Sequence, residues 1–216
     1  MTQKINSLIK KLAQTETKSD LFNPYNELTK PTDDRTAPGV RQQNLRMYLD
    51  SLEKSKPQFI CFFYAPLYDE SKRSGVPLTN VSNFKQVEEV LNIKKSFEKA
   101  TKSRGKPKLS SVASILWNTV EKIDEPIVFW PIIPFYPHKK SGLKTPRKFT
   151  NKELLKYKEL VVDIVDLFEP KIVLSIGKDT HEALDFLQVK HYELPHPRRN
   201  IKKFEASLKR NLKKTK

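Results

Sequence analysis

His196 is the residue whose setting most favours a chemical role. It lies between Pro195 and Pro197, directly after a short stretch of strand character. Proline fixes the backbone φ angle, so this loop is expected to hold the imidazole in one direction. A fixed imidazole can stabilise negative charge that develops on a leaving group. A purely structural histidine in a proline turn is the alternative.

The other histidines and the cysteine give no metal-binding pattern. His138, His181 and His191 lack the spacing of a metal-binding helix such as HExxH. Cys61 is the only cysteine, so no disulfide, Cys-rich zinc site or iron–sulfur cluster is expected. Its place in an apolar run predicts a buried, inert thiol. We therefore expect neither a metal nor a cofactor, in a reducing, cytoplasmic setting.

Positive charge is in large excess. The chain has 41 lysine and arginine residues against 25 aspartate and glutamate residues, which gives a formal net charge of +16. Basic side chains neutralise phosphates and release counterions, so this excess favours a nucleic-acid partner over a merely solvated surface. Two segments concentrate the charge, a basic loop near 94–108 and a C-terminal helix over 200–216 with a basic outer face.

Apolar runs of strand length alternate with amphipathic stretches along the chain. Strands are predicted at 58–64, 127–130, 171–176 and 191–194. Helices are predicted at 4–13, 44–52, 84–97, 110–122, 150–168, 179–187 and in the C-terminal tail. Thr150 and Glu153 have the spacing of a capping box at the start of the helix at 150–168. This alternation is typical of an α/β fold with three layers, α/β/α, around a short central, mainly parallel four-stranded sheet. A length of 216 residues fits one domain over 1–216. No apolar stretch approaches the about 20 residues of a membrane span.

In parallel sheets, functional sites lie beyond the carboxyl ends of the strands. That rule points to four segments of this chain, at 64–69, 131–138, 177–179 and 195–199. The second is predicted to begin an irregular loop that extends to Pro146, because its prolines lack the backbone donor that sheets and helices use.

The segments at these places resemble motifs of the uracil-DNA glycosylase superfamily, in a bacterial branch of uracil-DNA glycosylase-like proteins. The resemblance runs from about Asn23 to the end of the chain, and residues 23–25 (NPY) followed by 41–44 (RQQN) resemble the N-terminal part of that branch. The matching segments, in order, are 63–67 (FYAPL, where the branch has GEAPG), 74–79 (SGVPLT, for SGIPFT), 130–138 (WPIIPFYPH, for WNxxPFHPH), 177–178 (GK, for a Val-Gly-Arg/Lys turn) and 194–197 (LPHP, for a terminal His-Pro-Ser motif).

The resemblance implies an enzyme that flips a nucleotide out of DNA and breaks its glycosidic bond through a cationic, sugar-like transition state. A carboxylate would stabilise the cation or position water. An aromatic side chain and an amide would hold the base, and a histidine would stabilise the leaving base. His196 stands at the position of that histidine. No metal or cofactor is implied.

Other motif positions differ from the family. Tyr64 stands in place of the glutamate, and Ala65 in place of the aspartate of other branches. A phenol is neutral near pH 7 and does not substitute for a carboxylate. Leu78 replaces the stacking phenylalanine and Pro131 replaces the base-reading asparagine. These departures predict that ordinary uracil is not the preferred substrate.

Two acidic residues directly after the first motif could supply the missing carboxylate. Asp69 is the preferred candidate and Glu70 the second, while Asp33 and Asp34 are weaker ones. The base pocket is predicted to be lined by Tyr64, Ala65, Pro66, Tyr68, Leu78, Pro131 and Phe135. Ordinary surface acids are the alternative for the carboxylates.

Four basic residues are candidates for contacts with DNA phosphates. Arg198 and Arg199 follow His196 in a loop that lies against the DNA backbone in the family, and Lys139 and Lys140 come next in preference. Solvated surface charge is the alternative for each of them.

The sequence therefore favours a monomeric DNA glycosylase that leaves an abasic site. Its expected substrate is a modified or damaged pyrimidine, which includes the hypermodified bases of phage DNA. Such a substrate fits a role in antiviral defence or in base-excision repair. The alternative is a catalytically inactive, glycosylase-like DNA-binding or interaction protein.

Overall fold

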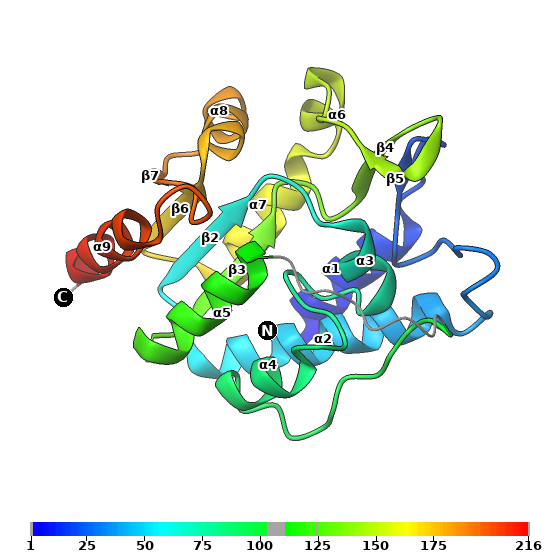
Figure 1. Ribbon diagram of the computed structural model, residues 1–216, viewed down its shortest axis with the longest axis horizontal. Helices are drawn as coiled ribbons and strands as arrows, with labels where there is room; N and C mark the ends of the chain where they lie inside the picture. Colours follow the sequence, from blue (N-terminus) through cyan, green and yellow to red (C-terminus); the bar gives the residue numbers. More distant parts are fainter. Residues whose placement is uncertain (1, 103–110, 124, 216) are drawn as a thin grey trace.

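The structure is a computed structural model that describes residues 2–102, 111–123 and 125–215. A four-stranded parallel sheet lies at its centre, in the order β3-β2-β6-β7 (Figure 1). The inner strands are β2 (Phe59–Phe63) and β6 (Ile172–Ile176), and the edge strands are β3 (Ile127–Pro131) and β7 (Tyr192–Leu194). The prediction of an α/β fold with a four-stranded parallel sheet is confirmed.

The inner strand β2 is continuously apolar because both of its faces are covered. Its five residues are all buried, and Cys61 lies among them as an inert thiol whose pKa is raised by burial. Phe59 pairs with Ile127 on one side and with Ile172 on the other. This register places the carboxyl ends of the strands at one edge of the sheet.

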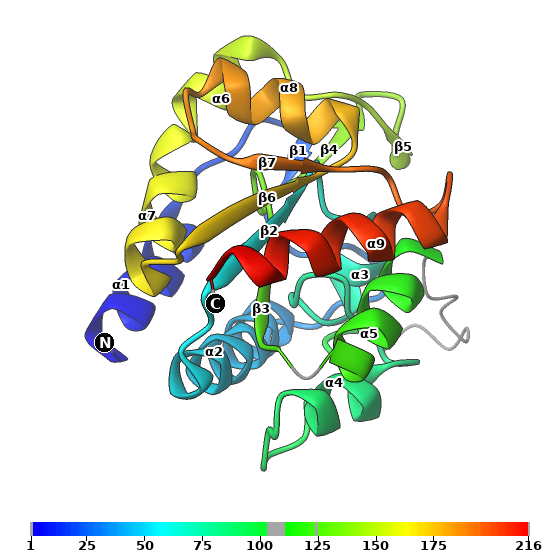
Figure 2. The ribbon, with the colours of Figure 1, turned by 90° about the vertical axis from the view of Figure 1, so that its left-hand side faces the viewer.

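Helices cover both faces of the sheet. Figure 2 shows α5 (Ser111–Ile123) and α9 (Ile201–Leu212) on one side of it, with α1 (Thr2–Gln14) and α7 (Lys158–Phe168) on the other. The helix α9 buries Phe204 and Leu208 and turns its lysines outward, which confirms the predicted amphipathic tail helix. A 3-10 turn over Lys213–Thr215 follows it.

The helix α2 (Ala37–Ser55) covers the edge strand β3. The hydroxyl of Tyr48 donates to the carbonyl oxygen of Phe129 (2.9 Å) and accepts from the backbone N–H of Phe129 (3.0 Å). Because an edge strand leaves such groups unpaired, this side chain satisfies the backbone of β3 where no further strand follows.

A small antiparallel sheet corrects one expectation. It has the order β1-β4-β5, from β1 (Leu21–Phe22), β4 (Tyr136–Lys139) and β5 (Gly142–Pro146). The prolines had predicted only an irregular loop here, which was wrong for β4 and β5. The carbonyl of Pro137 accepts from the N–H of Arg147, and the N–H of the next residue, His138, donates to the carbonyl of Asp20, so the segment makes backbone bonds despite its prolines.

Several helices differ from the prediction. The helix α2 covers Ala37–Ser55 and is longer at both ends than the predicted 44–52. The helix α4 (Phe84–Val90) stops early, where Asn92 adopts a left-handed backbone with φ +52°. The predicted helix at 150–168 is two helices, α6 (Asn151–Lys156) and α7, which divide at Tyr157. The short helix α3 (Tyr68–Arg73) was not predicted.

The basic loop at 94–108 is described only in part. Residues 94–102 form neither helix nor strand, as expected, and 103–110 lie outside the described residues. Within the part of the chain that the structure describes, no helix is long and apolar enough to cross a membrane.

Candidate functional site

Loops that the sequence analysis singled out meet at the carboxyl edge of the parallel sheet. The backbone N–H of Ile132, after β3, donates to the carbonyl of Phe63 at the end of β2 (3.0 Å). The N–H of Gly177, after β6, donates to the carbonyl of Leu194 at the end of β7 (2.9 Å). The first bond joins the loop after β3 to the loop after β2, and the second joins the loop after β6 to the loop after β7.

Gly177 makes room for His196. Its backbone has φ +76°, a conformation that glycine adopts without strain. A Cβ atom at this position would lie 3.1 Å from Cδ2 and 3.3 Å from Cβ of His196. The half-buried imidazole therefore packs directly against the turn that leads from β6 into α8 (Lys178–Phe186).

The hydrogen bonding of His196 selects one tautomer of its neutral ring. The backbone N–H of Arg198 donates to Nδ1 at 3.3 Å, so Nε2 carries the proton. Burial lowers the pKa of His196 below its ordinary value of 6.5, and the positive charges of Arg198 and Arg199 lower it further. At neutral pH this residue is an uncharged donor through Nε2–H.

Asp179 is the carboxylate that acts on this histidine. It lies in the first turn of α8, and its charge opposes the lowering of the His196 pKa. Its Oδ1 forms an ion pair with Nζ of Lys148 at 2.5 Å. The sequence analysis marked 177–179 as a loop of interest but did not select Asp179. Nothing in the sequence connects residues 148 and 179.

Tyr64, directly after β2, is half-buried. Its hydroxyl accepts from the backbone N–H of Phe149 (2.9 Å), and the two rings are 5.3 Å apart. Burial is the largest cause that raises the pKa of Tyr64, and the charge of Asp179 adds to it. The phenol is therefore neutral near pH 7, as expected.

A rigid frame positions Phe149. Arg147 donates to both oxygens of the Glu153 carboxylate, at 2.8 and 2.7 Å. Glu153 also closes the predicted capping box with Thr150, which begins α6. Because these bonds immobilise the residues on both sides of Phe149, the Tyr64 ring and Lys148 are held as well.

The structure places Asp69 in a different group of side chains. Asp69 is exposed on α3, 3.7 Å from Nε of Arg73, and its charge acts on Tyr68 and Tyr136. The rings of Tyr68 and Tyr136 lie 5.5 Å apart. Among the described residues, the carboxylate whose charge acts on both His196 and Tyr64 is Asp179, not Asp69.

The remaining acidic candidates are inside the protein or on other loops. The side chain of Asp33 is fully buried against Arg41, which assigns it a structural role. Glu70 is buried in α3. Asp34 is paired with Lys102 at 3.4 Å and lies on the loop before α2.

The predicted base-pocket residues are mostly buried. Ala65 is half-buried and Pro66 is buried after β2, and Pro131 is buried at the end of β3. Leu78 is buried with φ +54°. Phe135 is fully buried with its ring edge-on to Tyr157, so stacking on a base would require its side chain to move.

The four predicted DNA-contact residues are exposed. Lys139 and Lys140 lie at the turn between β4 and β5, while Arg198 and Arg199 lie between His196 and α9. Within residues 2–102, 111–123 and 125–215, none of these four side chains takes part in an ion pair. Their charges are available to an anionic partner.

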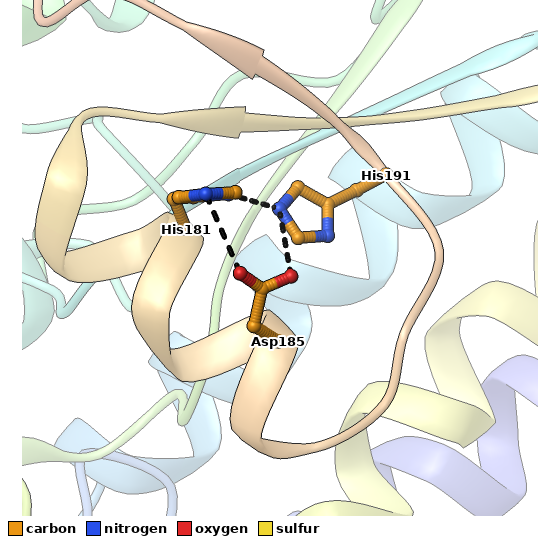
Figure 3. Close-up of side chains that lie close together, drawn as sticks. All are labelled: His181, Asp185 and His191. Carbon is orange, nitrogen blue, oxygen red and sulfur yellow. Dashed lines mark hydrogen bonds and ion pairs between the residues drawn. The ribbon is translucent and has the colours of Figure 1, made fainter.

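A second group of polar side chains was missed by the sequence analysis. His181, Asp185 and His191 bring one potential metal-ligand atom each to within 4.8 Å of one another (Figure 3). The two histidines are ten positions apart in the sequence, a spacing that matches no common metal-binding motif. The fold alone brings them together.

Comparison of the sequence with protein-family models and with curated proteins yields no match.

Proposed function

We propose that this chain is a DNA glycosylase that hydrolyses the N-glycosidic bond of a flipped base and leaves an abasic site. One observation carries the proposal. A neutral histidine with a proton on Nε2 lies at the carboxyl edge of a parallel sheet, packed against the turn at Gly177 that leads into α8. The motif order along the chain supports the same assignment, because it places His196 where the resembling family has its histidine.

His196 stabilises the leaving base in this proposal. When the C1′–N bond breaks, its electron pair departs with the base, which becomes anionic. A neutral imidazole donates a hydrogen bond from Nε2 to that anion and is not itself consumed. The lowered pKa keeps the ring in this donor form at neutral pH.

Asp179 stabilises the sugar in this proposal. Its negative charge would favour the cationic sugar and orient a water molecule toward C1′, with the water's proton released to solvent. Asp179 thereby takes the place of Asp69, which lies with Tyr68 and Tyr136. Tyr64 lines the site as an uncharged phenol and takes no part in the reaction.

The proposed substrate is DNA that carries a modified or damaged pyrimidine, rather than ordinary uracil. Leucine and proline at positions 78 and 131 offer neither the aromatic face nor the amide that reads uracil in the resembling family. Arg198, Arg199, Lys139 and Lys140 would hold the phosphates. A monomer acting on hypermodified phage DNA in the cytoplasm fits antiviral defence, and action on damaged DNA fits base-excision repair.

A second candidate function is a DNA-binding module without catalysis. The observation that favours it concerns positions 78 and 135. Leu78 has no aromatic ring and Phe135 is fully buried, so neither position offers an exposed ring on which a base could stack. The exposed basic residues would then serve binding alone.

The test is a base-release assay with the purified full chain. Substrates are normal DNA, uracil-containing DNA and phage DNA with hypermodified, including glycosylated, cytosines. Released bases are identified by mass spectrometry and abasic sites are counted. Release of a modified base supports the proposal, whereas DNA binding with no release from any substrate supports the non-catalytic module.

Two matched variants locate the carboxylate. We expect Asp179→Asn to reduce base release at least tenfold and Asp69→Asn to leave it within twofold, with both variants binding DNA like the parent. Glu182→Gln, on the exposed part of α8, is the control for loss of a negative charge from that helix. Equal activity of the parent and the Asp179→Asn variant would remove Asp179 from the mechanism.

A further inference from the structure

Three side chains on α8 and on the segment after it form a polar group that has no role in the proposed reaction. His181 and Asp185 are one helical turn apart on α8, and His191 precedes β7 (Figure 3). Figure 3 shows the two imidazoles and the carboxylate directed toward one another. Their ligand atoms all lie within 4.8 Å of one another.

His191 is oriented in the way that metal-binding histidines are oriented. Its Nδ1 lies 2.7 Å from the carbonyl oxygen of Val189, so Nδ1–H donates and Nε2 holds a free electron pair. That electron pair faces Nδ1 of His181 at 2.7 Å and Oδ1 of Asp185 at 4.0 Å. A backbone carbonyl on the far nitrogen fixes the ring and raises its basicity. The side chain is only 3% exposed, so its direction is set by packing.

Negative charge surrounds the second histidine. Nε2 of His181 lies 3.4 Å from Oδ2 of Asp185 and 4.0 Å from Oε2 of Glu193 in β7. The carboxylates of Asp185 and Glu193 and the unprotonated Nε2 of His191 thus all lie close to the ring of His181.

We propose that His181, Asp185 and His191 bind one divalent transition-metal ion, with the carboxylate of Glu193 close to the same site. Two imidazoles with carboxylates suit Zn²⁺ and its neighbours better than Mg²⁺ or Ca²⁺, which prefer oxygen alone. Tetrahedral zinc with bonds of about 2.0–2.1 Å places two ligand nitrogens roughly 3.3 Å apart. The histidine rings would therefore separate slightly, and the proton between them would move from Nδ1 to Nε2 of His181.

The position of the site defines its role. A bound ion would join α8 to the segment that enters β7, and His196 follows β7 by two residues. Asp179 begins the same helix α8. The ion would therefore be structural, because it would fix α8, which carries Asp179, to the segment that leads through β7 to His196. This inference does not depend on the proposed glycosylase activity.

Metal binding is tested directly on the full chain without an affinity tag, after removal of metals with a chelator. Calorimetry with Zn²⁺ is expected to give one site per chain, and Co²⁺ is expected to give the visible absorption of a tetrahedral complex. At a hundredfold excess of free Zn²⁺ over the dissociation constant, the melting temperature should rise by roughly 5–10 °C.

Variants assign the ligands. We expect Asp185→Asn and His181→Gln to weaken Zn²⁺ binding at least tenfold. Both side chains are partly exposed, so these variants should fold even if a change at the buried His191 does not. Glu182→Gln on the same helix and His196→Ala should bind Zn²⁺ like the parent. Failure of the parent to bind Zn²⁺ or Co²⁺, or unchanged binding by both ligand variants, would overturn the proposal and leave a proton-sharing histidine pair.

Discussion

The imidazole of His196 lies against Gly177, close enough that a single added methyl group would reach it. A Cβ atom at position 177 would come within 3.1 Å of Cδ2 of His196, which is closer than ordinary van der Waals contact. The two residues follow neighbouring strands, β6 and β7, and the hydrogen bond from Gly177 N–H to the Leu194 carbonyl fixes the two loops to each other. The direction of the imidazole therefore depends on a glycine in another loop.

Gly177→Ala is expected to displace His196. The alanine would have to adopt φ +76° and would push on the ring, so we expect a stability loss of about 1–2 kcal/mol. Base release should fall at least tenfold, while DNA affinity stays within twofold. Urea denaturation, base release and fluorescence anisotropy measure these three quantities.

Gly39→Ala is the control, because a Cβ atom at position 39 meets nothing within 4 Å and the substitution should stabilise α2 by about 0.4–1 kcal/mol. Full activity of the Gly177→Ala variant would show that the contact does not position His196.

The titration of His196 should follow its burial and its arginine neighbours. Its pKa lies below 6.5 in the folded protein, so nitrogen-detected NMR should show the neutral ring with Nε2–H at pH 7. The double substitution Arg198→Gln and Arg199→Gln should raise the pKa, and Arg210→Gln should not. A pKa at or above 6.5 in the parent protein would contradict the assignment.

The same shift has a consequence for stability. Folding disfavours the protonated imidazole, so the unfolded chain binds more protons than the folded chain between the lowered pKa and about 6.5. The folded state therefore loses stability as the pH falls from about 6.5 to the lowered pKa, and the loss is constant below it. His196→Gln should remove this part of the pH dependence. Denaturation midpoints of both proteins between pH 5 and 7.5 measure the difference, and parallel curves would refute it.

Tyr64→Phe should destabilise the protein by about 1 kcal/mol. The substitution leaves the ring in its tilted contact with Phe149 but removes the oxygen that accepts from the Phe149 N–H. The matched control is Tyr192→Phe, since Tyr192 is exposed and its ring contact with Lys214 needs no hydroxyl. Thermal denaturation distinguishes them, and equal melting temperatures for the two variants would argue against the Tyr64 bond.

Arg41 and Asp33 form a buried ion pair that holds the segment before α2. Both side chains are fully buried, and Arg41 also donates to the carbonyls of Lys72 (2.8 Å) and Glu27 (3.0 Å). Arg41→Met leaves the Asp33 charge unpaired, so we expect a loss of about 3–5 kcal/mol in chemical denaturation. The exposed Arg210→Met should change stability by no more than about 0.5 kcal/mol. A loss near zero at Arg41 would mean that Asp33 becomes protonated or solvated.

Local patterns in the sequence determined the elements of the parallel sheet. The apolar runs at 58–64 and 171–176 predicted β2 and β6, because a strand covered on both faces must be apolar throughout. Thr150 and Glu153 predicted the start of α6, because a capping box is made by residues three apart. The hairpin of β4 and β5 was missed, since its prolines are tolerated only where the particular ladder needs no donor.

The candidate site shows the limit of the same reasoning. The sequence by itself determined the α/β order, the basic surface and the loops that meet at the carboxyl edge, since each follows from short-range pattern or from composition. Only the tertiary structure decided which carboxylate acts on His196, and it favours Asp179 over Asp69. It also decided that His181, Asp185 and His191 converge. The physical reason is that electrostatic and ligand contacts depend on distance in space, and the packing of α8 against the strands sets those distances.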